Sequence, residues 1–116
     1  MDVLLIESNN KAMEARFIEK NPKTRKRIKQ NLPISGYSKL YKEEVYFSTQ
    51  LDLDKEDATQ EVEKGDIGFW QRGDAICFFY GQTDPVSPIN VFAKIKEGLK
   101  EFRKINEGDK IKLTKN

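Results

Sequence analysis

The segment from residue 65 to residue 82, GDIGFWQRGDAICFFYGQ, holds the side chains of this chain that are best suited to chemistry. It contains the only cysteine, Cys77, the only tryptophan, Trp70, and an arginine, Arg72, between two apolar runs. A cysteine is a nucleophile only as the thiolate, and a neighbouring base or cation must lower its pKa. The chain has no histidine, which leaves Arg72 as the nearby cation. Residues that alternate along a strand are usually core or wall residues, so we interpret Cys77 as structural and not catalytic.

The absence of histidine and the single cysteine exclude several kinds of site. Ser–His–Asp and Cys–His catalysis within one chain, an internal disulfide and a multi-cysteine zinc site are all impossible. The glycines of the segment follow strand geometry and fit neither the dinucleotide-binding pattern nor the P-loop pattern. We therefore expect no metal and no cofactor.

Acidic residues are dense in the middle of the chain. Asp52, Asp54, Glu56 and Glu63 have the spacing of ligands 1, 3, 5 and 12 in a calcium-binding loop. The sixth position of that loop needs glycine for its sharp turn, and here it is Asp57. Strands are expected on both sides, where the calcium motif has helices. We therefore interpret the segment as a solvated connector.

Basic residues are concentrated earlier in the chain, at Lys20, Lys23, Arg25, Lys26, Arg27 and Lys29. They fall on a short predicted helix whose apolar residues, Ile28 and Leu32, face inward. Single-stranded nucleic acids usually stack on aromatic side chains, and none lies among these charges. Because the net charge is only +2, we interpret the run as a solvated helix face and expect no nucleic-acid partner.

Length and composition predict one small domain spanning residues 1–116. The chain is 34% charged, but its apolar residues are clustered and periodic, which favours a folded domain with a charged surface. Its apolar runs are far shorter than the roughly 20 residues that span a bilayer. The N-terminus carries an acid at position 2 and no cationic region typical of a signal peptide. We expect a cytoplasmic protein with no membrane partner, and the oligomeric state stays open.

The apolar periodicity predicts a mainly β fold. Strands are expected at 2–7, 12–18, 43–53, 66–70, 75–80 and 89–95, with a last one near the C-terminus. Asn21 as the cap and Pro22 as the first residue predict a helix that ends near Asn31. Leu99 and Phe102, with Ile95 or Ile105, have helical spacing and predict a second, amphipathic helix over 96–105. Short strands with two helices indicate a closed or nearly closed barrel of about eight strands, capped by helices.

Five phrases of the sequence occur in a recognisable order: NPKT at the start of a helix, then GDIGFW, GDAICFFYG, VFAKIKEGL and EGDKIKL. In this order they resemble the cyclophilin-like family of small prokaryotic barrel proteins, which look like minimal or atypical cyclophilins. The resemblance covers about Val3 to Leu113 and is most specific over 65–99. It implies a barrel with two helices closing its ends and a ligand groove on one outer face.

The resemblance also implies which side chains face the groove. The period of two along 75–80 would place Ile76, Phe78 and Tyr80 in the core and Ala75, Cys77 and Phe79 toward the groove. On the strand KLYKEEVYFSTQLDL, Phe47 and Gln50 match a phenylalanine and a glutamine of the cyclophilin pocket. The implied groove residues are Phe47, Gln50, Trp70, Gln71, Arg72, Cys77 and Phe79.

True cyclophilins are peptidyl-prolyl isomerases, in which an arginine donates to the twisting prolyl amide. That arginine is absent, because its position holds Lys39 or Lys42, and lysine offers a point charge in place of a planar fork. The histidine that lines many cyclophilin pockets is absent as well. Arg72, at the tip of the predicted hairpin, and Lys42 are the remaining candidate donors.

Three hypotheses about function remain open. The first is a binding module for a proline-containing peptide or a small molecule, without rapid turnover. The second is a weak peptidyl-prolyl cis–trans isomerase that uses Arg72 or Lys42. The third is an interaction or scaffold protein whose groove has become vestigial. The missing arginine and histidine favour the first hypothesis.

Overall fold

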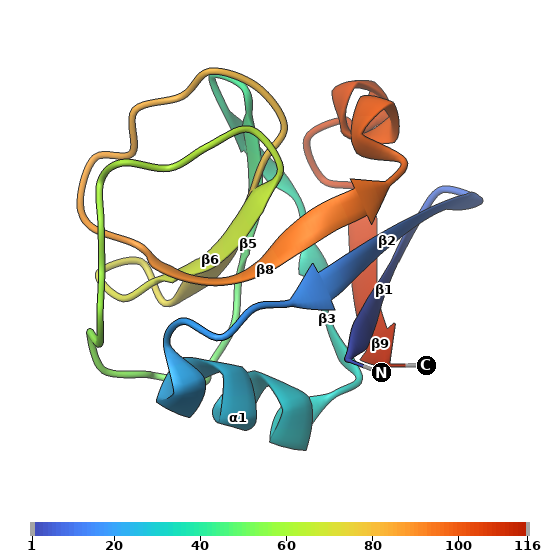
Figure 1. Ribbon diagram of the computed structural model, residues 1–116. Helices are drawn as coiled ribbons and strands as arrows, with labels where there is room; N and C mark the ends of the chain where they lie inside the picture. The colour runs from blue at the N-terminus through green and yellow to red at the C-terminus, as the bar shows by residue number, and fades with distance from the viewer. Residues whose placement is uncertain (1, 116) are drawn as a thin grey trace.

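The strands form one continuous antiparallel sheet that curves into a nearly closed barrel (Figure 1). The computed structural model describes residues 2–115. Within that range the sheet order is β3-β9-β1-β2-β8-β6-β7-β5-β4. The nine strands are β1 (Val3–Ser8), β2 (Lys11–Phe17), β3 (Ile34–Tyr37), β4 (Lys39–Tyr41), β5 (Glu44–Ser48), β6 (Asp66–Trp70), β7 (Ala75–Phe79), β8 (Asn90–Glu97) and β9 (Lys110–Lys115). The predicted mainly β, nearly closed barrel is confirmed.

The barrel has one strand more than the expected eight or so. Residues 34–37 and 39–41 form β3 and β4, which the sequence did not predict as strands. They are short, and they form because β9 and β5 offer them free edges for pairing. Where β3 approaches β5, a Cβ at Gly36 would lie 2.4 Å from the Phe47 ring. Glycine at this position therefore allows the two ends of the sheet to come together.

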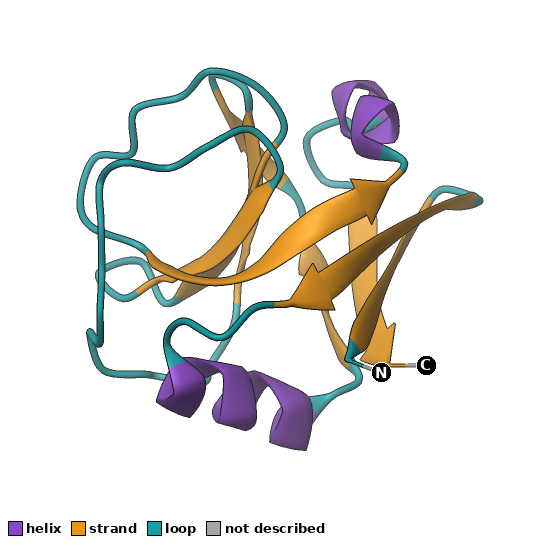
Figure 2. Cartoon of the chain, viewed as in Figure 1, coloured by secondary structure: helices purple, strands orange, loops and turns teal. Residues whose placement is uncertain are grey.

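Two helices cover opposite ends of the barrel (Figure 2). Helix α1 (Pro22–Asn31) buries Ile28, and η1 (Leu99–Lys104) buries Phe102. The amphipathic helix expected over 96–105 is present but shorter. Strand β8 continues to Glu97, Gly98 turns the chain at φ 84°, and η1 is a 3₁₀-helix. The spacing of Leu99, Phe102 and Ile105 is three residues, which suits three residues per turn. No helix among the described residues is long and apolar enough to cross a membrane.

The N-terminus of α1 is capped by a residue that is distant in the sequence. Asn21 was expected to cap it, but its side chain makes no capping hydrogen bond; it donates to the Val91 carbonyl and accepts from the Asp57 amide. The Glu56 carboxylate takes the capping role, since it accepts from the backbone amides of Lys23 and Thr24 at 3.1 and 3.0 Å. The acidic connector is thus tied to the helix by one of its own carboxylates.

Replacing Glu56 by alanine should lower the free energy of unfolding by about 0.5–2 kcal/mol, the usual cost of losing a helix cap. Partial burial raises the pKa of Glu56, but the hydrogen bonds from Thr24 and Lys23 outweigh it, and the pKa is lowered. The carboxylate therefore stabilises the fold above the ordinary glutamate pKa, and this contribution is lost as the pH falls through the lowered value. Urea unfolding at neutral and acidic pH measures both effects. Equal losses for Glu61→Ala, an exposed residue of the same connector, would contradict the capping role.

Two long loops, 49–65 and 80–89, each contribute an apolar side chain, Val62 and Ile89, to the outer face of β7. As expected, Ile76 and Phe78 point into the main core, with Tyr80 packed against it. Cys77 and Phe79 point the other way and form a second apolar cluster with Ile89 and Val91. Because both faces are covered, every residue of β7 is buried.

Candidate functional site

The second cluster forms the floor beneath a pocket on the outer face of the sheet. Register places Glu44 opposite Phe79 and Tyr46 opposite Cys77 across the β5–β7 pair. Side chains of opposed residues lie on the same face of a sheet. Glu44 and Tyr46 therefore stand over this floor, while Val45 and Phe47 point into the barrel core.

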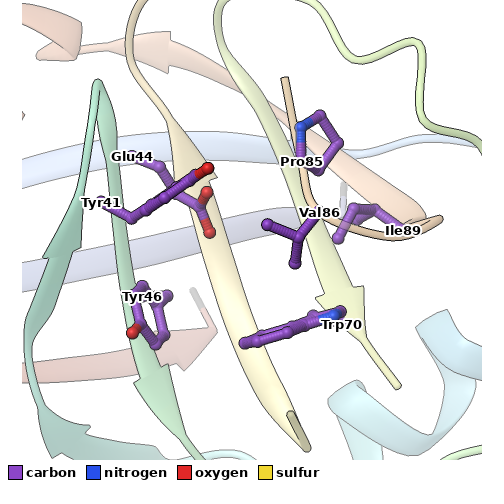
Figure 3. A pocket seen from close by; sticks show the side chains of 7 residues that line it. All are labelled: Tyr41, Glu44, Tyr46, Trp70, Pro85, Val86 and Ile89. Carbon is purple, nitrogen blue, oxygen red and sulfur yellow. The ribbon is translucent and has the colours of Figure 1, made fainter. Parts of the chain in front are cut away.

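The pocket brings side chains from four parts of the chain together (Figure 3). It is a small pocket with a cavity volume of about 80 Å³, and it is partly open to solvent. Side chains from β4 and β5 stand on one side, those of the 80–89 loop face them across the gap, and the indole lies below. The lining residues are Tyr41, Glu44, Tyr46, Trp70, Pro85, Val86 and Ile89.

Trp70 is held in place on three sides. Its indole N–H donates to the Ser87 hydroxyl at 2.6 Å, and its ring meets Tyr46 edge to face at 6.0 Å. A Cβ at Gly73 would lie 2.3 Å from the indole, so the glycine of the 71–74 turn leaves room for it. The aromatic wall is therefore pre-organised, which reduces the entropy that a ligand would have to remove on binding.

Glu44 is a buried acid in this apolar setting. Its exposed fraction is 6%, and burial raises the pKa of its carboxyl group, although a hydrogen bond from the Cys77 thiol opposes the shift. Burial, followed by the charge of Glu44, raises the pKa of the Cys77 thiol well above its ordinary value. The thiolate form of Cys77 is thus disfavoured, and its full burial in the second cluster argues against a role as a nucleophile.

Replacing Glu44 by glutamine should raise the melting temperature at neutral pH. A raised folded-state pKa means that the acid favours folding only while it is protonated, and this contribution is lost as the pH rises through that pKa. Glutamine keeps the shape without the charge, so the gain should shrink in acid, below the ordinary glutamate pKa. Thermal unfolding at both pH values measures it, with exposed Glu97→Gln as the control. An equal effect of Glu44→Gln at both pH values would contradict the prediction.

The structure places two of the implied groove residues away from this pocket. Phe47 is fully buried in the barrel core, where its ring stacks on Phe78 with centroids 6.2 Å apart. Gln50 lies beside a different hollow, near Pro33 and Leu51. Neither side chain lines the pocket over the second cluster.

Of the remaining implied residues, one lines the pocket, two lie beneath it and two lie outside it. Trp70 lines it, whereas Cys77 and Phe79 are fully buried in the floor beneath. Gln71 and Arg72 lie on the 71–74 turn that follows Trp70, and neither lines the pocket. Lys42, the other candidate donor, does not line the pocket either, but its ammonium group lies 5.4 Å from the centroid of the Tyr41 ring, which does.

Sequence reasoning missed Tyr41, Glu44, Tyr46 and the lining residues of the 80–89 loop. A signal for two of them was present. The alternation along 43–49 separates Glu44 and Tyr46 from the core residues Val45 and Phe47, so they were identifiable as outward-facing. The loop residues had no such signal, because they reach the pocket only through tertiary contacts.

Comparison with known proteins agrees with the barrel and its order of elements. A family model described as Cyclophilin-like matches residues 2–114. The chain belongs to the cyclophilin-like family. No curated protein matches this cyclophilin-like chain.

Two solved structures share the fold of this cyclophilin-like protein. The solution structure of the hypothetical protein AF2241 from Archaeoglobus fulgidus is 31% identical, with a TM-score of 0.81, and the match covers 99% of this chain and 95% of that one. The structure of McbB in complex with tryptophan is 13% identical, with a TM-score of 0.70. That match covers 96% of this chain and 44% of McbB, so the second likeness shows the fold alone.

Proposed function

We propose that this cyclophilin-like protein is a binding module for a small molecule with an apolar or aromatic body. The observation that carries the proposal is the pocket over the second cluster, where the rings of Tyr41, Tyr46 and Trp70 face apolar loop side chains. Concave sites lined by aromatic and aliphatic groups with a few polar atoms are the usual form of small-ligand sites. Aromatic walls contribute large buried area with little loss of side-chain freedom.

The comparison with McbB adds support at the level of the fold. McbB was solved in complex with tryptophan, a small molecule with an aromatic body. The likeness concerns the fold, and it supports the idea that such a barrel can serve small-molecule binding. The lining residues of the present pocket, and not the neighbour's ligand, are the basis of the proposal.

Isomerase chemistry has weaker support from the geometry. It requires a donor aimed at the prolyl amide beside an apolar pocket. Arg72 lies on the turn outside the pocket lining, and Lys42 is turned toward the Tyr41 ring. We therefore expect that NMR exchange spectra of an Ala-Pro peptide show no acceleration of cis–trans isomerisation by the protein. The uncatalysed reaction takes roughly tens of seconds.

The emission of Trp70 tests the proposal directly, because Trp70 is the only tryptophan and lines the pocket. Titration with 2-phenylethanol, a neutral probe, should change this emission along a saturating curve. Amide shifts of isotope-labelled protein should move around Tyr46, Trp70 and Ile89 and stay unchanged around Gln50, which lies beside the other hollow. A linear, unsaturated emission change, or shifts that cluster at Gln50, would overturn the proposal.

A further inference from the structure

Glu44 is unusual among the acids of this chain because it is buried without a basic partner. Its exposed fraction is 6%, and among residues 2–115 it forms no ion pair with a lysine or arginine. The neighbouring acid, Glu43, pairs with Arg103 at 3.0 Å. Buried charges in proteins are normally paired, because desolvation penalises an isolated charge strongly. The thiol of Cys77 is a weak donor and does not neutralise the carboxylate.

The surroundings of Glu44 add further negative potential. Burial raises the pKa of the Tyr46 phenol, and the charges of Glu44 and Glu107 raise it further, so both carboxylates act on this wall. The faces of Tyr41, Tyr46 and Trp70 carry the partial negative charge of their π-systems. Two lysines lie near the pocket edge. Lys42 contacts the Tyr41 ring, and Lys39 is opposite Tyr46 across the β4–β5 pair, so it lies on the same face. Among residues 2–115 neither forms an ion pair with Glu44.

We propose that the pocket selects ligands that carry a protonated amine on an apolar or aromatic body, with the ammonium group bound by Glu44 and the body against Tyr46 and Trp70. This inference rests on the proposed function and names the ligand class for the same pocket. The ammonium group supplies the positive partner that Glu44 lacks in the chain, and the aromatic faces attract it as well. An anionic head group on the same body would meet Glu44 and be repelled.

Three probes with one phenyl body and different head groups test the charge preference. They are 2-phenylethylamine, which is cationic, 2-phenylethanol, which is neutral, and 3-phenylpropanoate, which is anionic. Trp70 emission and calorimetry give the Kd of each at neutral pH. We expect the amine to bind about tenfold more tightly than the alcohol, as a hydrogen bond to a charged group implies, and the acid to bind most weakly.

The variant Glu44→Gln should bring the ratio of amine to alcohol affinity close to one. Glu97→Gln removes the same charge from an exposed site at the far end of β8 and should keep the wild-type ratio. Thermal unfolding of both variants shows whether each is folded. A wild-type amine affinity no higher than that of the alcohol, or a Glu44→Gln variant that keeps the preference, would overturn the inference.

The failure of this inference is distinguishable from the failure of the proposed function. If the alcohol binds and the amine binds no better, the pocket is a small-ligand site without charge selection, and only the inference falls. If none of the three probes gives a saturating change in wild-type protein, the proposed function and the inference fall together.

Discussion

A Phe78→Ala chain should unfold with a free energy about 3–5 kcal/mol lower than that of the wild type. Phe78 is fully buried at the centre of the barrel, and its ring stacks on Phe102 at 5.2 Å and on Phe47 at 6.2 Å. Alanine would leave a cavity between two rings fixed on η1 and β5, so the walls cannot collapse to fill it. Domains of this size are stable by only about 5–15 kcal/mol, so the variant should be close to unfolding.

Urea unfolding followed by circular dichroism measures this loss. The midpoint should fall while the slope with denaturant stays the same, since the same surface is exposed on unfolding. Tyr37→Ala is the matched control, because Tyr37 is 67% exposed and its removal should cost within about 0.5 kcal/mol. A loss below about 1 kcal/mol for Phe78→Ala would show that the barrel core repacks freely.

The second large effect concerns binding. Trp70→Ala should weaken 2-phenylethylamine binding by about thirtyfold or more, which corresponds to the ~2 kcal/mol typical of an aromatic hot spot. The substitution removes one wall of the pocket and leaves the Ser87 hydroxyl without its indole donor. It also removes the edge-to-face partner of Tyr46. Calorimetry is the suitable measurement, because the variant has no tryptophan emission.

Trp70→Phe separates the two contributions of this side chain. Phenylalanine keeps an aromatic surface against Tyr46 but cannot donate to Ser87, so we expect an affinity between those of the wild type and Trp70→Ala. Unchanged binding in the alanine variant would place the ligand elsewhere on the molecule. That result would redirect the search to the hollow beside Gln50.

The elements that could be predicted from the sequence are those whose signal is local. The hairpin 66–79 was predictable because apolar residues with a period of two flank a turn at 71–74. Helix α1 was predictable from the proline at its first position. Strands β3 and β4 were not, because three or four residues carry too little periodicity, and pairing with β9 and β5 creates them.

The candidate site was predictable only in part, for a related reason. The alternation of side chains along β7 identified its outward-facing residues. The same alternation on β6 places Trp70, which is opposite Ala75, on the outer face. Yet the pocket also needs Tyr41 from the end of β4 and Val86 from the 80–89 loop. The first depends on a strand with no sequence signal, and the second on a loop held by contacts such as the hydrogen bond from Gln60 to the Pro85 carbonyl.

The order of the sheet has a consequence for the time course of folding. Strand β1 lies between β2 and β9, with Leu4 opposite Lys115, so residues from the two ends of the described chain are neighbours. Contacts between distant residues form late, because a long loop must close first, and domains rich in them fold in roughly milliseconds to seconds. During synthesis the β1–β2 hairpin must wait for β8 and β9 with both edges unpaired. Unpaired strand edges invite association with other chains, so this interval is the period in which a nascent chain most needs protection by chaperones.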